Sequence, residues 1–89
     1  MSPVARVELL TKPGCHLCDV ARDVIEIVCA ETGDDWSETS IESDPALYDE
    51  FGERIPVVLV DGRVHEYWRV SPDRLRAALN TPPDTRPAP

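Results

Sequence analysis

Two cysteines separated by two residues are the side chains in this sequence with the clearest chemical potential. Cys15 and Cys18 follow a Pro-Gly turn, and the third cysteine, Cys29, lies further along the chain. Two thiols at this spacing can approach to disulfide-bonding distance. A C-x-x-C pair also supplies half of many tetrahedral zinc sites. The spacing therefore indicates either thiol redox chemistry or metal binding.

A zinc site within one chain needs further ligands beside this cysteine pair. The remaining cysteine and histidines are Cys29, His16 and His65. If Cys18 and Cys29 share one helix, the rise per residue separates them by about 16 Å, too far for a common metal or a disulfide bond. We therefore predict a redox pair, Cys15 and Cys18, with Cys29 as a buried core thiol and no metal site.

The elements around the cysteine pair would place it at the start of a helix. Residues 4–10 have the composition of a strand, and residues 15–30 have helical periodicity. Cys15 would then lie at the helix N-terminus, where free N–H groups and the helix dipole stabilise a thiolate, the attacking species in disulfide exchange. Cys18, one turn deeper, is placed to resolve a mixed disulfide formed on Cys15.

The predicted helix carries a narrow polar stripe. Its members recur at helical spacing: Asp19, Arg22, Asp23 and Glu26. Apolar residues cover the remainder, so we expect this helix to be buried on most of its surface, as a crossover helix against a sheet would be.

The rest of the chain continues the alternation of strands and helices. Residues 36–41 predict a strand, Asp44–Pro45 a capped helix start, and Asp61–Gly62 a hairpin turn between strands 56–60 and 63–68. Ser71–Pro72 predicts the start of a last helix, which ends near Leu79. The order β-α-β-α-β-β-α predicts an α/β fold: a four-stranded mixed sheet with flanking helices.

Length and composition limit the classes of function that this chain can have. The 89 residues predict one domain, residues 1–79, followed by a proline-rich, disordered tail at 80–89. A net charge of −8 without a basic patch argues against nucleic acid as a partner. We find neither a long apolar run nor a secretory signal, and the odd cysteine count does not suit a secreted disulfide framework. We expect a cytoplasmic monomer without a membrane partner.

Residues 11–18, with the sequence TKPGCHLC, resemble the site of the glutaredoxins, in which a lysine and two further residues precede C-x-x-C. The resemblance continues through residues 48–57, which include Ile55–Pro56, and on through the last helix, so that it covers residues 4–79. It implies a thioredoxin-like fold in which Ile55–Pro56 is a cis peptide bond opposite the dithiol.

The resemblance also implies a function, that of a glutaredoxin-like thiol–disulfide oxidoreductase in cell redox homeostasis. Cys15 and Cys18 would be the catalytic residues, and no cofactor would be tightly bound. The substrate would be a disulfide-containing protein or a low-molecular-weight thiol, with glutathione as a candidate co-substrate. The residues expected to contact the substrate are Lys12, His16, Ile55, Pro56 and Trp68.

Two departures from the glutaredoxin pattern leave alternatives open. His16–Leu17 stands between the cysteines, where glutaredoxins usually carry Pro-Tyr, and residues 67–72 lack the usual Gly-Gly pair. Some glutaredoxins without the inter-cysteine proline carry an iron–sulfur cluster between two protomers, which makes a cluster carrier one alternative. The other is a non-catalytic binding module that holds a partner in the groove near Trp68. The sequence leaves the physiological reductant open.

Overall fold

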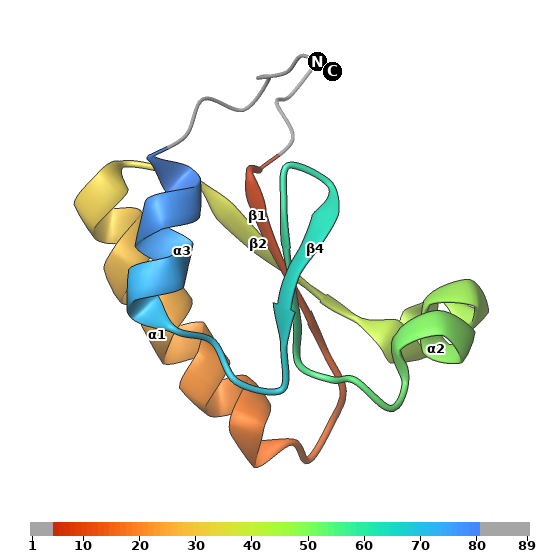
Figure 1. The fold of residues 1–89 in the computed structure, drawn as a ribbon. Coiled ribbons are helices and arrows are strands. Elements are labelled where there is room, and N and C mark those ends of the chain that lie inside the picture. Colours follow the sequence, from red (N-terminus) through yellow and green to blue (C-terminus); the bar gives the residue numbers. More distant parts are fainter. Residues whose placement is uncertain (1–4, 81–89) are drawn as a thin grey trace.

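The computed structural model describes residues 5–80 and shows a four-stranded mixed sheet flanked by helices (Figure 1). The strand order is β2-β1-β3-β4, with β1 and β2 parallel and the other neighbours antiparallel. The predicted fold class and element order are confirmed. In chain order the elements are β1 (Val7–Thr11), α1 (His16–Thr32), β2 (Trp36–Ser40), the 3-10 helix η1 (Ile41–Ser43), α2 (Pro45–Phe51), β3 (Val57–Val60), β4 (Arg63–Tyr67) and α3 (Pro72–Leu79).

Local capping signals set the element boundaries as expected. The Asp44 and Ser71 side chains accept hydrogen bonds from backbone N–H groups of Ala46 and Arg74, at 3.0 and 3.2 Å. Asp61 and Gly62 both have positive φ, 54° and 83°, as a type I′ hairpin turn requires. The differences are small: β1 starts later than predicted, α1 runs two residues further, and η1 was not expected. Apart from residue 80, the predicted tail lies outside the described residues.

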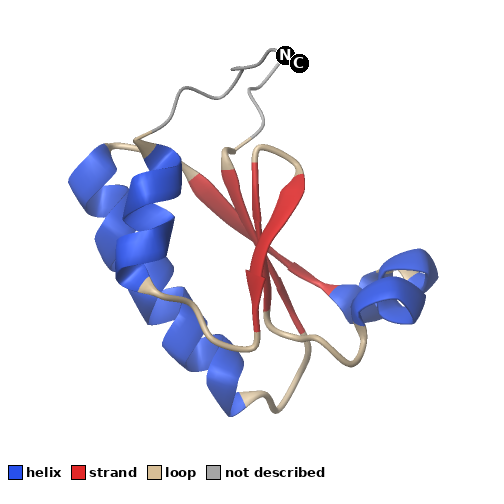
Figure 2. Ribbon diagram, in the orientation of Figure 1, coloured by secondary structure: helices blue, strands red, loops and turns tan. Residues whose placement is uncertain are grey.

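Helices cover both faces of the sheet (Figure 2). α1 and α3 lie side by side over one face, whereas α2 lies on the other side. Successive strand residues point to opposite faces, so that Leu9 packs under α1 while Leu10 packs on the α2 side. The cluster under α1 and α3 contains Val7, Leu9, Ala21, Ile25, Val28, Cys29, Val58, Val60, Leu75 and Leu79. The cluster on the α2 side contains Leu10, Cys18, Ile41, Phe51, Ile55 and Val57.

The expectation that α1 is buried on most of its surface is wrong. Its buried residues are confined to one stripe, Cys18, Ala21, Ile25, Val28 and Cys29. The apolar side chains of Leu17, Val20 and Ile27 are 41%, 59% and 61% exposed. The physical reason is that α1 belongs to an outer layer. The sheet and α3 cover one side of it, and no element of residues 5–80 covers the other.

Candidate active site

Cys15 occupies the N-cap of α1. Gly14, with φ of 76°, turns the chain between β1 and the helix. The Cys15 Sγ then accepts a hydrogen bond from the backbone N–H of Cys18 at 3.2 Å, as a serine or aspartate oxygen does at other N-caps. The predicted position of the cysteine pair at the helix start is confirmed. A negative charge on Cys15 is favoured there by a free N–H group and by the helix dipole.

The two cysteines differ sharply in their surroundings. Cys15 is half-buried, whereas Cys18 is 2% exposed and packs in the apolar cluster on the α2 side. Burial, with a further contribution from the hydrogen bond with Cys15, raises the pKa of Cys18 to about 12. The pair therefore combines one accessible sulfur with one that is held as a neutral thiol.

Cys29 behaves as the predicted core thiol. It is 3% exposed in the cluster beneath α1 and α3. Burial raises its pKa to about 11, and the charge of Asp34 acts in the same direction. Within residues 5–80, no three His, Cys, Asp or Glu side chains are grouped so that they could hold a metal ion.

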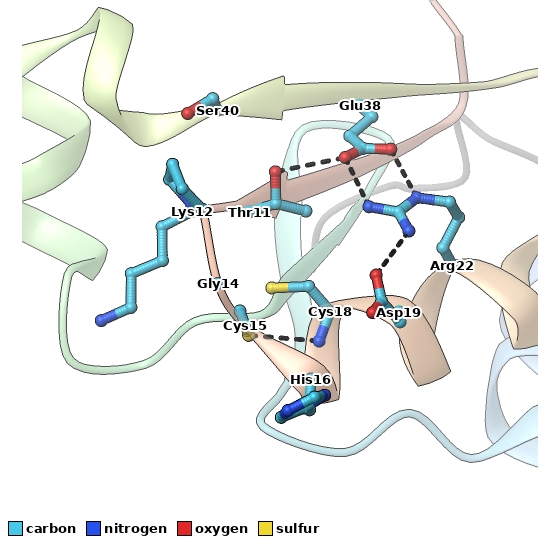
Figure 3. Close-up of a pocket in the computed structure, with 11 residues that line it drawn as sticks. Thr11, Lys12, Gly14, Cys15, His16, Cys18, Asp19, Arg22, Glu38 and Ser40 are labelled. Carbon is cyan, nitrogen blue, oxygen red and sulfur yellow. Dashed lines mark hydrogen bonds and ion pairs between the residues drawn. The ribbon is translucent and has the colours of Figure 1, made fainter.

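A pocket of about 420 Å³ opens beside the dithiol (Figure 3). Both cysteines line it, together with two of the predicted substrate contacts, Lys12 and His16. The remaining lining residues come from the β1–α1 loop, α1, and the β1 and β2 strands: Thr11, Pro13, Gly14, Asp19, Arg22, Glu38 and Ser40.

The other three predicted contacts, Ile55, Pro56 and Trp68, do not line this pocket. The Ile55–Pro56 bond is cis, as expected. Ile55 shares the apolar cluster with Cys18, but Ile55 and Pro56 are both buried. The Trp68 backbone N–H donates to the Pro56 carbonyl at 2.8 Å, and its Nε1 donates to the Glu53 carbonyl at 3.1 Å. Trp68 therefore lies beside Pro56, as predicted. Its two hydrogen bonds are to residues just before β3.

Trp68 and Tyr67 form an exposed aromatic pair. The Trp68 indole is 52% exposed and meets the Tyr67 ring edge-to-face, with ring centroids 5.0 Å apart. The Arg54 guanidinium lies 5.7 Å from the Tyr67 ring centroid. Trp68 has φ of 69°, a left-handed conformation that bulky residues rarely adopt. The hydrogen bonds to Pro56 and Glu53 hold it there.

A second group of pocket residues was not singled out from the sequence. The Nε and Nη2 of Arg22 donate to the two carboxylate oxygens of Glu38, each at 2.8 Å, and its Nη1 donates to Asp19 at 2.8 Å. Thr11 Oγ1 donates to Glu38 at 3.3 Å. The hydrogen bonds from Arg22 hold the pKa of Glu38 below its usual value. The i, i+3 spacing of Asp19 and Arg22 could have suggested an ion pair. Glu38 lies close to them because β2, which carries it, pairs with β1 beneath α1.

The fold and the site together define a class. A mixed sheet in the order β2-β1-β3-β4, a C-x-x-C pair at the start of α1 and a cis-proline before β3 are features of a thioredoxin-fold protein. The family model described as "Glutaredoxin-like domain" matches residues 6–80, and the chain belongs to this family.

Individual relatives agree with this assignment. The uncharacterized protein Rv0508 of Mycobacterium tuberculosis is 40% identical, with 91% of this chain and 94% of that protein covered. The X-ray structure of protein XcR50 from X. campestris superposes with a TM-score of 0.69 at 32% identity, covering 83% of this chain and 95% of that one. A thioredoxin mutant from Halobacterium salinarum superposes with a TM-score of 0.62 at 20% identity, covering 91% and 76%, and supports the fold alone. None of the helices in residues 5–80 is long and apolar enough to cross a membrane.

Proposed function

We propose that this protein is a thiol–disulfide oxidoreductase whose working groups are Cys15 and Cys18. One observation carries the proposal. The half-buried Cys15 sulfur accepts a hydrogen bond from the backbone N–H of Cys18 at the start of α1, while the Cys18 side chain lies buried one turn away. The first sulfur lies at a helix N-terminus, a position that favours an anion, and is open to a substrate, whereas the second is buried. Membership of a glutaredoxin-like family supports a redox-type function.

The reaction has two exchange steps. The Cys15 thiolate attacks a substrate disulfide, one substrate sulfur leaves as a thiolate, and a mixed disulfide forms on Cys15. Cys18 then loses its proton to solvent and attacks the Cys15 sulfur. The bond to the substrate breaks, and its electron pair leaves with the second substrate sulfur. The substrate gains two electrons, and the protein ends with a Cys15–Cys18 disulfide that an external thiol must reduce.

The pocket supports a role for Lys12 and His16 in substrate contact, since both lie on its wall beside Cys15. The surface at Trp68 could contact a protein substrate, because Trp is enriched where proteins bind one another. We propose a disulfide-containing protein or a low-molecular-weight thiol as substrate. Glutathione is a candidate for the external thiol, and equilibration in glutathione and thioredoxin redox buffers would identify the reducing system.

Serine substitutions at the two cysteines test the mechanism. Cys15→Ser should abolish reduction of a small neutral disulfide, because serine is not a nucleophile in this exchange. Cys18→Ser should complete the first step only and accumulate a mixed disulfide, visible as added mass on the intact protein. Cys29→Ala, outside the pocket, is the matched control and should retain turnover. Undiminished activity in Cys15→Ser would contradict the proposal.

A further inference from the structure

A charged network shares the pocket with the dithiol. Figure 3 shows Arg22 held between Glu38 and Asp19, with Thr11 hydrogen-bonded to Glu38. Arg22 lies four positions after Cys18 on α1, so the two side chains are neighbours on one face of the helix. The guanidinium therefore shares a pocket wall with the sulfur that the proposed mechanism must ionise while it remains buried.

Charged side chains share the pocket with Cys18. From the sheet and the α2 side, it meets the apolar residues of its cluster. The titratable and charged side chains that line the pocket with the two cysteines are Lys12, His16, Asp19, Arg22 and Glu38. Burial has the largest effect on the pKa of Cys18 and raises it. A hydrogen bond with the backbone of Lys12 lowers it, and the positive charge of Arg22 lowers it by a smaller amount.

We propose that Arg22 and Glu38 are positioning residues for the resolving step, a role that rests on the function proposed above. Arg22 stabilises the thiolate of Cys18 through its charge. Glu38 holds the guanidinium in place by two hydrogen bonds and offsets part of that charge. The pair thereby sets how quickly the mixed disulfide on Cys15 is resolved.

The resolving step exchanges one bond for another. The Cys18 thiol releases its proton to water in the open pocket, and the resulting thiolate attacks the Cys15 sulfur. The bond between Cys15 and the substrate sulfur breaks, and that sulfur leaves with the electron pair and takes a proton from solvent. Glu38 is a poor acceptor for the Cys18 proton, because its hydrogen bonds with Arg22 favour the ionised carboxylate.

The two partners of the ion pair should have opposite effects on this step. Arg22→Gln removes the cation and leaves the carboxylates of Asp19 and Glu38 on the pocket wall, so the thiolate becomes scarcer. Glu38→Gln removes a negative charge but keeps an amide oxygen that can accept a hydrogen bond from Arg22. The cation stays in place, so the thiolate becomes more abundant. Because nucleophilicity falls as basicity falls, each tenfold change in thiolate abundance should change the resolving rate by about threefold. A purely structural ion pair would instead give changes of the same sign in both variants.

Stopped-flow kinetics with an aromatic disulfide that releases a coloured thiolate would separate the two steps. The first release reports attack by Cys15, and the second reports resolution by Cys18. Cys18→Ser, which should show only the first release, identifies the phases. Rates are measured from pH 6 to pH 9, where the second phase should rise with pH as the thiolate fraction of Cys18 rises.

The chain offers a closely matched control. Arg76 on α3 bonds Glu31 on another helix at 2.8 Å and Asp73, three residues before it, at 2.9 Å. Like Arg22, it joins a carboxylate on its own helix to one on another element, although it makes one hydrogen bond to Glu31 where Arg22 makes two to Glu38. It does not line the pocket. Arg76→Gln should therefore leave both phases unchanged. Arg22→Lys, which keeps a positive charge, should recover part of the rate lost in Arg22→Gln and guards against a folding defect.

The expected result is a second phase about threefold slower in Arg22→Gln and about threefold faster in Glu38→Gln at neutral pH. Changes of the same sign in both variants, or an Arg22→Gln rate equal to that of Arg76→Gln, would overturn the inference. A wild-type protein that shows no second phase would instead contradict the proposed function. The two failures are thus distinguishable.

Discussion

At the scale of single residues, the dithiol is asymmetric because its two sulfurs lie in different surroundings. Cys15 caps a helix at the wall of an open pocket, whereas Cys18 is packed among apolar side chains three residues later. The N-terminus of a helix favours an anion, whereas an apolar core disfavours one. This contrast, rather than the motif alone, is the reason we propose Cys15 as the attacking group and Cys18 as the resolving group.

The asymmetry predicts which cysteine an alkylating reagent reaches. At neutral pH we expect modification at Cys15 only, because Cys18 and Cys29 are buried and their pKa values are raised to about 12 and 11. Raised values keep both thiols protonated until the pH approaches those values, so their labelling should increase only at strongly alkaline pH. Peptide mass spectrometry after brief exposure measures this. The denatured protein, in which all three should react, is the control, and native labelling of Cys18 as fast as Cys15 would contradict it.

At the scale of elements, α1 performs two tasks with one buried stripe. Its first turn carries the cysteines, and its middle section packs on the sheet and on α3 through Ile25 and Val28. The outer side leaves Val20 and Ile27 exposed. The stability contributed by the helix should therefore be concentrated in its buried stripe, although apolar residues also lie on its outer side.

Two isoleucines on α1 test this arrangement. Ile25 is fully buried, whereas Ile27 is 61% exposed. Ile25→Ala should lower the free energy of unfolding by about 2–5 kcal/mol, because it opens a cavity in the core. Ile27→Ala should change it by no more than about 0.5 kcal/mol, since alanine is also the better helix former. Urea denaturation followed by circular dichroism measures both, and equal losses in the two variants would contradict the one-sided burial of α1.

At the scale of the whole molecule, Arg6 interacts with several segments at one end of the sheet. It donates two hydrogen bonds to Asp61 in the hairpin, each of 3.0 Å, and one to the Leu79 carbonyl at 3.1 Å. It also lies 3.6 Å from Asp34, which follows α1. The strand register puts this end opposite the dithiol, because Val7 pairs with Val60 whereas Leu10 pairs with Val57.

This separation predicts that stability and chemistry can be changed independently. Arg6→Ala should lower the free energy of unfolding by about 1–2 kcal/mol, since it leaves partly buried acceptors without a donor. The rate of disulfide exchange in the folded protein should not change. Thermal unfolding and the two-phase kinetic assay, run on the same sample, measure both quantities. A parallel loss of exchange rate below the unfolding transition would show that the two ends of the sheet are coupled.

Much of this protein could be predicted from its sequence, because the deciding signals are local. The side chains of Ser71 and Asp44 cap the starts of two helices, and Asp61–Gly62 forms a tight turn. The placement of Cys15 at a helix N-terminus follows from the turn before it and the periodicity after it. The cis bond before Pro56 came only with the family resemblance.

The tertiary structure alone decided which residues surround Cys18. Glu38 meets Arg22 because β1 and β2 pair in parallel, with Leu9 opposite Glu38, and this register brings together side chains that are 16 positions apart. It also decided that Val20 faces solvent, since apolar periodicity does not tell how many sides of a helix are covered. Capping and turns depend on neighbours in the chain, whereas burial and ion pairing depend on packing between elements. The sequence therefore determined where the dithiol lies, and the packing determined the electrostatic environment in which it works.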